Sequence, residues 1–352
     1  MKHKFLAGLV AVAIAAGGAL TITFALTSNR QPKDEAYPYH SARFTEFVND
    51  SFRNGSGGDA KDFYRWMEKS YKEFCTKHSC RPTLSLTQLL RVKRTELAGI
   101  RDVHKKTLAE IDFATWLHKL VRITIPKFSL DRGFEFRNVV MYGERQCFLQ
   151  SVLISGMLQE AGVRSGVEMV YMSISGEVSN NGHAITLVKL PNGSDIIVDA
   201  SDPEPFARHQ GLFVKMSDYR YVNPEYDGKT AYILSYKGAS NGRRFSTASV
   251  KTLGIDFLRS QFYYYSGERV PGALLSAKPT QSGLSAAQKY FEASVRACPQ
   301  NPLSVYMLGR VYLAQGQRAK ALRTLLRANK LYANARWVPP GANEYLELAK
   351  HG

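Results

Sequence analysis

Three residues in the middle of this chain of 352 residues have side chains suited to nucleophilic chemistry. Cys147 comes first, His183 follows it, and Asp199 comes last. A cysteine attacks as its thiolate, a histidine can carry the proton, and a carboxylate can hold the imidazole in one tautomer. These residue types predict a Cys–His–Asp site that works through a covalent intermediate.

Two kinds of element must position these side chains. The apolar run from Phe148 to Ala161 predicts a helix that Gly162 ends, so Cys147 lies at the helix N-terminus. Free backbone amides and the helix dipole at that end stabilise a thiolate. β-Rich runs follow at residues 167–172, 184–190 and 196–198. His183 would then open the second strand, and Asp199 would end the third.

Pro191-Asn192-Gly193-Ser194 between the last two strands predicts a hairpin, and the hairpin sets a geometric condition. Side chains alternate between the faces of a strand, so the length of the loop decides which residues share a face. A loop of two or four residues would place His183 and Asp199 on opposite faces. The triad therefore predicts a loop of three or five residues, or a bulge.

Three short segments carry a resemblance to a known family: Arg145-Gln146-Cys147-Phe148, Gly182-His183-Ala184 and Val198-Asp199-Ala200. Over residues 130–205 the chain resembles the transglutaminase-like superfamily, whose papain-like fold presents Cys, His and Asp in this order. The resemblance implies that Cys147 is the nucleophile, His183 the general base and acid, and Asp199 the orienting carboxylate. It implies an antiparallel sheet in the core.

The chain departs from the family pattern at several positions. Arg145 stands where the family often has glycine, and Ile185 stands where an aromatic residue is common. Asp202 lies three residues after Asp199 and is a rival for the carboxylate role. Tyr142 is the candidate for an upstream side chain that stabilises an oxyanion, next to the backbone amide of Cys147.

The pattern as a whole predicts an α+β fold in several parts. Leu308-Gly309, Tyr312, Gly316 and Leu325 match the spacing of a tetratricopeptide repeat within residues 302–335. The expected parts are a signal-anchor or signal peptide (1–30), a helical N-terminal region (41–125), a transglutaminase-like core (126–236), a linker region with some helix (237–282) and a repeat-like helical tail (283–352).

The N-terminus indicates export. Residues Phe5 to Leu26 carry no charge and are enough to span a bilayer as a helix. We expect a single-pass anchor in the cell membrane, with the main domain outside the cytoplasm in the periplasm or the extracellular space. The alternatives are a signal peptide cleaved near Gly17-Gly18-Ala19, which would give a secreted protein, and a buried core helix.

The other cysteines agree with an oxidising compartment. Cys75 and Cys80 are closely spaced, which predicts a small-loop disulfide. A metal pair that uses His78 is the alternative for this segment. We interpret Cys298 as a small buried hydrophobic residue.

The formal charge of +17 predicts an anionic neighbour. Hydrophobic residues make up 44% of the chain and charged ones 22%, which excludes a disordered, collagen-like or polytopic membrane protein. Export argues against nucleic acid as the partner. Four cations recur at helical spacing in the tail and form either a solvated face or a surface for an acidic protein or envelope partner: Lys320, Arg323, Arg327 and Lys330.

The sequence therefore predicts an exported, membrane-anchored thiol enzyme that acts on an amide or peptide bond of a protein or peptide through an acyl-thioester. Hydrolysis, deamidation and cross-linking remain open, because either water or an amine can resolve the thioester. No metal or cofactor is expected. The alternative is a catalytically inactive scaffold or binding protein that works through its repeat-like region.

Overall fold

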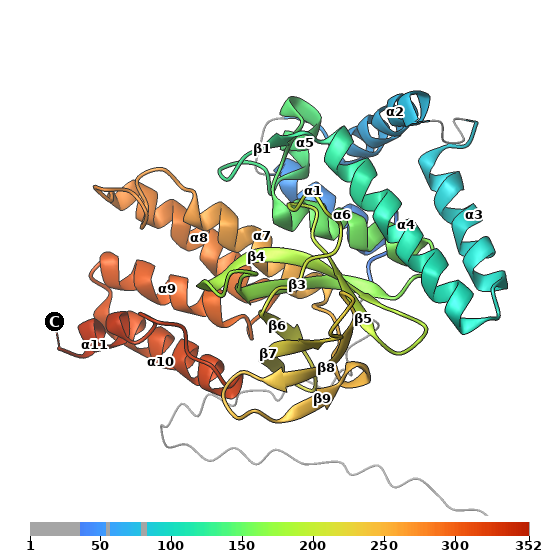
Figure 1. The fold of residues 1–352 in the computed structure, drawn as a ribbon. Coiled ribbons are helices and arrows are strands. Elements are labelled where there is room, and N and C mark those ends of the chain that lie inside the picture. The colour runs from blue at the N-terminus through green and yellow to red at the C-terminus, as the bar shows by residue number, and fades with distance from the viewer. Residues whose placement is uncertain (1–35, 54–56, 79–82, 352) are drawn as a thin grey trace, which may run out of the picture. The chain divides into compact units, whose positions relative to one another are not determined.

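The computed structural model describes residues 36–53, 57–78 and 83–351, which form a mixed α/β structure (Figure 1). The expected anchor or signal at residues 1–30 lies outside these ranges. Cys80 of the expected disulfide also lies outside them, whereas Cys75 is buried. None of the helices in the described ranges is both long enough and apolar enough to cross a membrane.

The described chain is mainly helical up to Glu160, forms strands between Ser165 and Ser246, and is helical again from Ile255 onward. The helices are α1 (Ala42–Arg53), α2 (Ala60–His78), α3 (Leu86–Gly99), α4 (Val103–Thr124), α5 (Phe136–Tyr142), α6 (Cys147–Glu160), α7 (Ile255–Glu268), α8 (Gln281–Ala297), α9 (Pro302–Ala314), α10 (Arg318–Asn334) and α11 (Glu344–His351). The strands are β1 (Lys127–Phe128), β2 (Glu144–Arg145), β3 (Ser165–Met172), β4 (Val178–Lys189), β5 (Asp195–Val198), β6 (Gly211–Lys215), β7 (Tyr219–Tyr226), β8 (Ile233–Gly238) and β9 (Arg244–Ser246).

Helices α1, α2 and α4 bury aromatic side chains, and α3 buries leucines. Phe47 of α1 and Phe63 of α2 both meet the ring of Phe136 in α5, with ring centroids 5.7 and 4.8 Å away. Ser85 and Asp102 cap α3 and α4, because each side chain accepts a hydrogen bond from a backbone amide of the first turn. These helices form one side of the core that supports the site.

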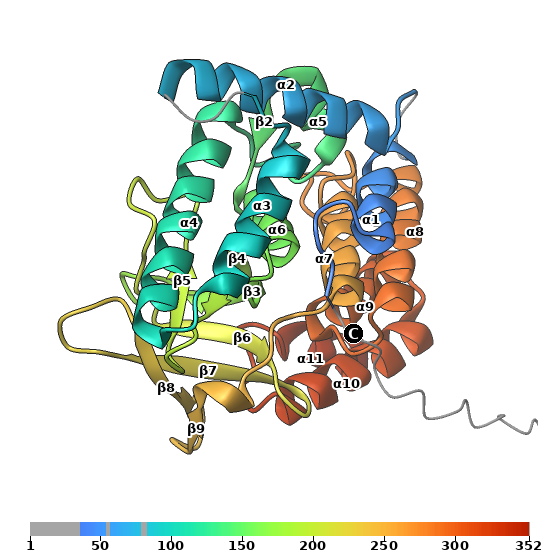
Figure 2. The same cartoon turned by 90° about the vertical axis from the view of Figure 1, so that its right-hand side faces the viewer.

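Helix α6 is apolar on every face and is buried along its length, from Phe148 to Leu158. It packs against β3 and β4 on one side and against α3 and α4 on the other (Figure 2). Gly156 lets Phe44 of α1 approach α6 closely, because a Cβ atom at position 156 would lie 2.7 Å from the Phe44 ring. The helix that begins at Cys147 is therefore held rigidly from both sides.

The seven strands β3 to β9 form an antiparallel sheet in the order β5-β4-β3-β6-β7-β8-β9. The sheet closes on itself because Asp195 of β5 also pairs with Ile233 of β8. Alternation along β4 divides its side chains between two cores. Ala184 and Val188 join the main core beside α6, and Ile185 joins a smaller core enclosed by the sheet.

Glu168 of β3 is an isolated acid in the core. Its carboxyl is fully buried, and neither oxygen has a hydrogen-bond partner among the described residues. Burial raises the pKa of Glu168 well above its usual value of 4.5, against the opposing effect of Lys189. The folded protein therefore keeps a proton that the unfolded chain releases above about pH 4.5.

Because of that retained proton, the free energy of unfolding should fall as pH rises above about 4.5 until the raised pKa is passed. The Glu168→Gln variant should lose this part of the pH dependence. Its free energy of unfolding, relative to that of the wild type, should therefore be higher at pH 8 than at pH 5. Urea unfolding at the two pH values measures it, with exposed Glu177→Gln as the matched control. Equal pH dependence in Glu168→Gln and the wild type would contradict the prediction.

Residues 237–282, which the sequence suggests are a linker region, contain β9 and the largely buried helix α7. Phe262 of α7 meets Phe47 of α1, with ring centroids 5.8 Å apart, and Phe257 meets Phe213 of β6 at 5.6 Å. Helix α7 thus joins the N-terminal helices to the sheet. Many of the Gly, Ser and basic residues that suggest a linker lie in the segments before and after α7.

Helices α8 to α11 form the tail, and α9 and α10 pack side by side (Figure 1). Gly309 of α9 allows the close approach, because a Cβ atom there would lie 2.7 Å from the side chain of Leu325 in α10. A buried hydroxyl cluster links α7, α8 and α9 through Ser260, Ser294 and Ser304, with oxygen separations of 2.6 to 3.1 Å. The same hydroxyls fix the tail on α7.

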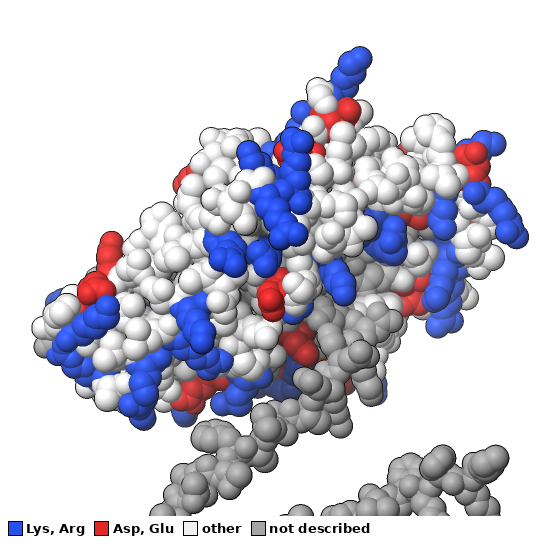
Figure 3. Space-filling model, turned by 90° about the horizontal axis from the view of Figure 1, so that it is seen from below, with Lys and Arg blue, Asp and Glu red and all other residues white. Residues whose placement is uncertain are grey.

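The tail also contacts the sheet. Tyr332 of α10 accepts a hydrogen bond of 2.9 Å from the side-chain amide of Asn180 in β4, and Trp337 packs on Tyr171 of β3 with ring centroids 4.8 Å apart. Lys320 and Arg323 lie on the exposed side of α10 together with Arg327 and Lys330. Lys and Arg are more widespread than Asp and Glu on the face shown in Figure 3.

Candidate active site

The structure brings Cys147, His183 and Asp199 together from three elements. Cys147 is the first residue of α6, His183 lies within β4, and Asp199 follows directly after β5. The His183 Nε2 atom lies 2.8 Å from Oδ2 of Asp199. The Cys147 thiol interacts with the same imidazole and raises its pKa. His183 is thus placed between a thiol and a carboxylate.

The hairpin between β4 and β5 accounts for the His183–Asp199 contact. Lys189 pairs with Asp195, so the connection at residues 190–194 has five residues. An odd number keeps His183 and Asp199 on the same face, because side chains alternate along each strand. The expected odd number of residues in the hairpin loop is confirmed.

Asp202, the rival carboxylate, has other partners. Its Oδ1 atom accepts a hydrogen bond of 2.9 Å from the backbone amide of Glu204. Its backbone carbonyl accepts hydrogen bonds from His118 and Arg122 of α4. Among the described residues, the carboxylate that meets His183 is that of Asp199.

A second histidine completes the surroundings of Asp199. His209, just before β6, is buried, and its Nε2 atom lies 2.8 Å from the same Oδ2 atom of Asp199. The other oxygen of Asp199 accepts from the backbone amide of Ser201 at 2.9 Å. No sequence motif marks His209, and its position depends on the path of the chain from β5 to β6.

Charge and hydrogen bonding affect the pKa values of His183 and Asp199 more strongly than burial does. Burial alone would lower the pKa of His183, but Cys147 and the hydrogen bonds to Asp199 and Cys147 raise that pKa to about 10. Burial alone would raise the pKa of Asp199, but hydrogen bonds from His183 and His209 hold it well below its usual value. The arrangement favours a protonated imidazole on His183 and an ionised carboxylate on Asp199.

His209 should act as a positioning residue, since its ring donates to the oxygen of Asp199 that also receives His183. Loss of a hydrogen bond to a charged group costs about 1.5–3 kcal/mol. We expect His209→Leu to slow alkylation of Cys147 at pH 6 by about tenfold. His209→Gln, which keeps a donor, should recover part of the rate. Rates equal to wild type in both variants would show that Asp199 does not need this partner.

Tyr265 of α7 is a buried tyrosine whose ring packs against Phe148, the residue after Cys147. Its ring packs edge-on against Phe148 with centroids 5.5 Å apart, and its hydroxyl has no hydrogen-bond partner among the described residues. Burial raises its pKa, and the charge of Cys147 raises it further. Tyr142, the candidate from the sequence, is 40% exposed and lies under the guanidinium of Arg132 instead. Tyr265 comes from a distant segment, so no local pattern indicated it.

The remaining free cysteine in the described chain is structural in character. Cys298 is 6% exposed, and its sulfur lies 3.5 Å from the hydroxyl of Tyr219. Burial raises the pKa of its thiol. Such an environment suppresses the thiolate, in contrast to the surroundings of Cys147.

His183, Asp199 and His209 are also close enough for one ligand atom of each to reach a common metal ion, since these atoms lie within 4.8 Å of one another. Both imidazole Nε2 atoms, however, lie 2.8 Å from a single carboxylate oxygen, which is hydrogen-bond geometry. We therefore interpret the cluster as a hydrogen-bonded relay.

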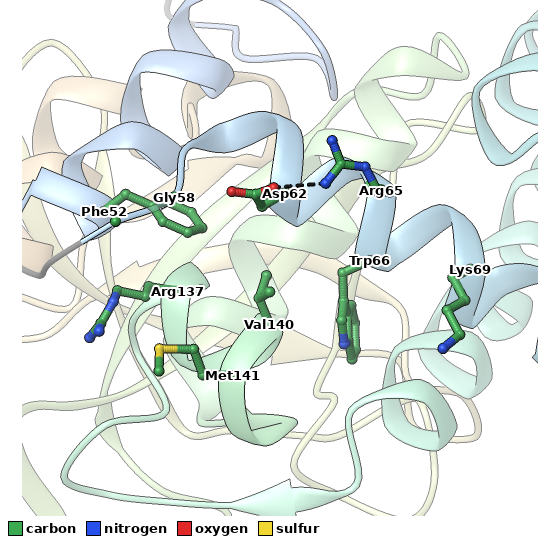
Figure 4. Close-up of a pocket in the computed structure, with 10 residues that line it drawn as sticks. Phe52, Gly58, Asp62, Arg65, Trp66, Lys69, Arg137, Val140 and Met141 are labelled. Atoms are coloured by element: carbon green, nitrogen blue, oxygen red, sulfur yellow. Dashed lines mark hydrogen bonds and ion pairs between the residues drawn. The ribbon is translucent and has the colours of Figure 1, made fainter.

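A separate hollow of about 500 Å³ lies between α2 and α5 (Figure 4). Trp66 and Met141 contribute to its apolar lining, and Asp62 is paired there with Arg65 at 2.9 Å. None of the residues of the Cys147 site lines it.

No protein-family model matches this chain, and no curated protein or solved structure gives a significant match to it. The geometry of the site is consequently the basis for assigning a function.

Proposed function

We propose that this protein is a thiol enzyme that cleaves or exchanges an amide or peptide bond through an acyl-thioester on Cys147. The observation that carries the proposal is the position of His183, hydrogen bonded to Asp199 through one nitrogen, with a pKa that the Cys147 thiol raises. The resemblance of the three short segments to the transglutaminase-like superfamily supports the same chemistry.

The reaction would proceed in two balanced steps. The Cys147 thiolate attacks the carbonyl carbon, and the amide C–N bond breaks as His183 gives its proton to the leaving amine. Water then gives a proton to His183 and its hydroxyl to the carbonyl carbon, which releases a carboxylic acid and restores the thiolate. An amine in place of water would form a new amide. Asp199 keeps the imidazole oriented in both steps.

The first test compares two cysteines of one protein. Iodoacetamide at pH 6 should alkylate Cys147 much faster than Cys298, because an imidazolium beside Cys147 favours the thiolate and burial disfavours it at Cys298. Peptide mass spectrometry after timed quenching gives both rates. 4-Nitrophenyl acetate should then acetylate Cys147 in the wild type faster than in His183→Ala.

If Cys147 proves inert in the folded, reduced protein and His183→Ala changes nothing, the scaffold function takes the place of the enzyme. The protein would then work through the exposed helices of its tail.

We further propose that the enzyme works outside the cytoplasm, held at the cell membrane by residues 1–30, with secretion after cleavage as the alternative. The four exposed cations of α10 fit an acidic protein or envelope partner. Cell fractionation with protease protection of the full chain tests the location. Recovery of the chain in the cytoplasm would contradict it.

A further inference from the structure

A basic cavity of about 530 Å³ adjoins the segments that carry the proposed triad. Its walls come from α4, from β2 just before Cys147, and from the loop after Asp199 through Pro203 and Pro205. Its volume is in the range of pockets that hold a small ligand or one side chain of a larger one. None of the proposed function's three catalytic residues lines it.

Three cations line this cavity, and no acidic side chain does. Lys119 and Arg122 come from α4, and Arg145 comes from β2. Within the described ranges, none of the three forms an ion pair with a carboxylate. The Nε atom of Arg145 is buried without a hydrogen-bond partner there. Burial and the charge of Arg122 lower the pKa of Arg145, so these cations repel one another and an anion between them would relieve the repulsion.

The two guanidinium groups are anchored by the same segments that hold the reactive groups. Arg145 donates to the side-chain oxygen of Gln150 in α6 at 2.9 Å, and Gln150 donates in turn to the carbonyl of Ala200 at 3.1 Å. Arg122 donates to the carbonyl of Asp202 in the loop that begins at Asp199. Each guanidinium uses one anchor and has five N–H donors, so donors remain for a ligand.

We propose that this cavity binds a carboxylate of the substrate, so that the enzyme prefers acidic peptides. The inference rests on the proposed function, since it places the carboxylate beside the bond that Cys147 attacks. Arginine pairs are suited to a carboxylate because the planar fork can donate two parallel hydrogen bonds. The wall that His118 forms is also fixed by a hydrogen bond of 3.1 Å to Asp202, so the site is preorganised.

The test uses two peptides that differ in one carboxylate, acetyl-Ala-Glu-Ala-amide and acetyl-Ala-Gln-Ala-amide. Calorimetry with the Cys147→Ala variant measures their binding without any chemistry. We expect the Glu peptide to bind at least tenfold more tightly than the Gln peptide. Arg122→Gln should abolish this preference, and Lys119→Gln, whose side chain is exposed, should reduce it without disturbing the fold. Arg101→Gln on the exposed α3–α4 connection is the matched control and should keep it.

Equal affinity for the two peptides in Cys147→Ala would overturn the proposal, as would an unchanged preference in both Arg122→Gln and Lys119→Gln. Competition by inorganic phosphate at concentrations below those of the Glu peptide would identify a phosphate site and would also overturn it. The binding readout is independent of alkylation of Cys147. If Cys147 is inert but the Glu peptide still binds more tightly, the proposed enzyme activity is wrong and the carboxylate site stands. If Cys147 is reactive but the two peptides bind equally, the carboxylate site is wrong and the proposed enzyme activity stands.

Discussion

The His183→Ala variant should alkylate at Cys147 about 100-fold more slowly than the wild type at pH 6. The thiolate is the form that attacks, and removal of His183 removes the cation that would stabilise it at Cys147. The pKa of His183 is raised to about 10, so the imidazolium persists across the neutral range and its effect should be present at pH 6 and at pH 8. Acyl transfer should fall by about 10³-fold or more, since the variant also loses its general acid and base.

The rate of alkylation as a function of pH measures this directly. The wild type should show a high rate that changes little between pH 5 and 8, and His183→Ala should show a rate that climbs with pH as a free thiol does. His104→Ala, at an exposed histidine of α4, is the matched control and should behave like the wild type. Identical pH profiles for His183→Ala and the wild type would mean that His183 does not influence the thiol.

The Tyr265→Phe variant should lower kcat for acyl transfer by about 10²-fold while the fold is kept. Tyr265 is 5% exposed, and the charge of Cys147 contributes to raising the pKa of its hydroxyl. A buried hydroxyl that interacts electrostatically with the thiol is suited to stabilise the negative oxygen of the tetrahedral intermediate. Only the hydroxyl is removed, so packing against Phe148 remains.

Steady-state hydrolysis of 4-nitrophenyl acetate compares Tyr265→Phe with Tyr142→Phe. The structure predicts a large loss of kcat in the first variant and none in the second, because Tyr142 is exposed and stacked under Arg132. Alkylation of Cys147 by iodoacetamide should stay near the wild-type rate in Tyr265→Phe, since that reaction develops no oxyanion. A loss of alkylation equal to the loss of kcat would instead indicate that Tyr265 supports the position of the thiol.

Parts of the site could be anticipated because they depend on local pattern. The apolar run after Cys147 specifies a buried helix, and a residue at its first position must lie at the N-terminus. The alternation along β4 and the odd hairpin loop then fix which face His183 and Asp199 share. Membership of the transglutaminase-like superfamily and of the tetratricopeptide repeats stays a prediction.

The segment at 237–282, expected as a linker region with some helix, contains a helix whose partners the sequence did not indicate. Its turns are rich in Gly, Ser and basic residues, and they surround a helix whose aromatic side chains fill the core beside α1 and β6. Composition averaged over the whole segment hides that helix. Tyr265 lies on it, and so this candidate for the oxyanion could not be connected with Cys147.

The three reactive residue types and the helix N-terminus that holds Cys147 could be predicted from the sequence, because they depend on residue identity and on periodicity within a few turns. The sequence set the condition of an odd hairpin loop, and the structure supplied the loop that meets it. Only the folded chain shows that His209 shares Asp199, that the charge of Cys147 acts on Tyr265, and that Arg122 and Arg145 line one cavity. These contacts join segments far apart in the chain, and their geometry depends on how the closed sheet and the helices around α6 pack, which no local pattern encodes.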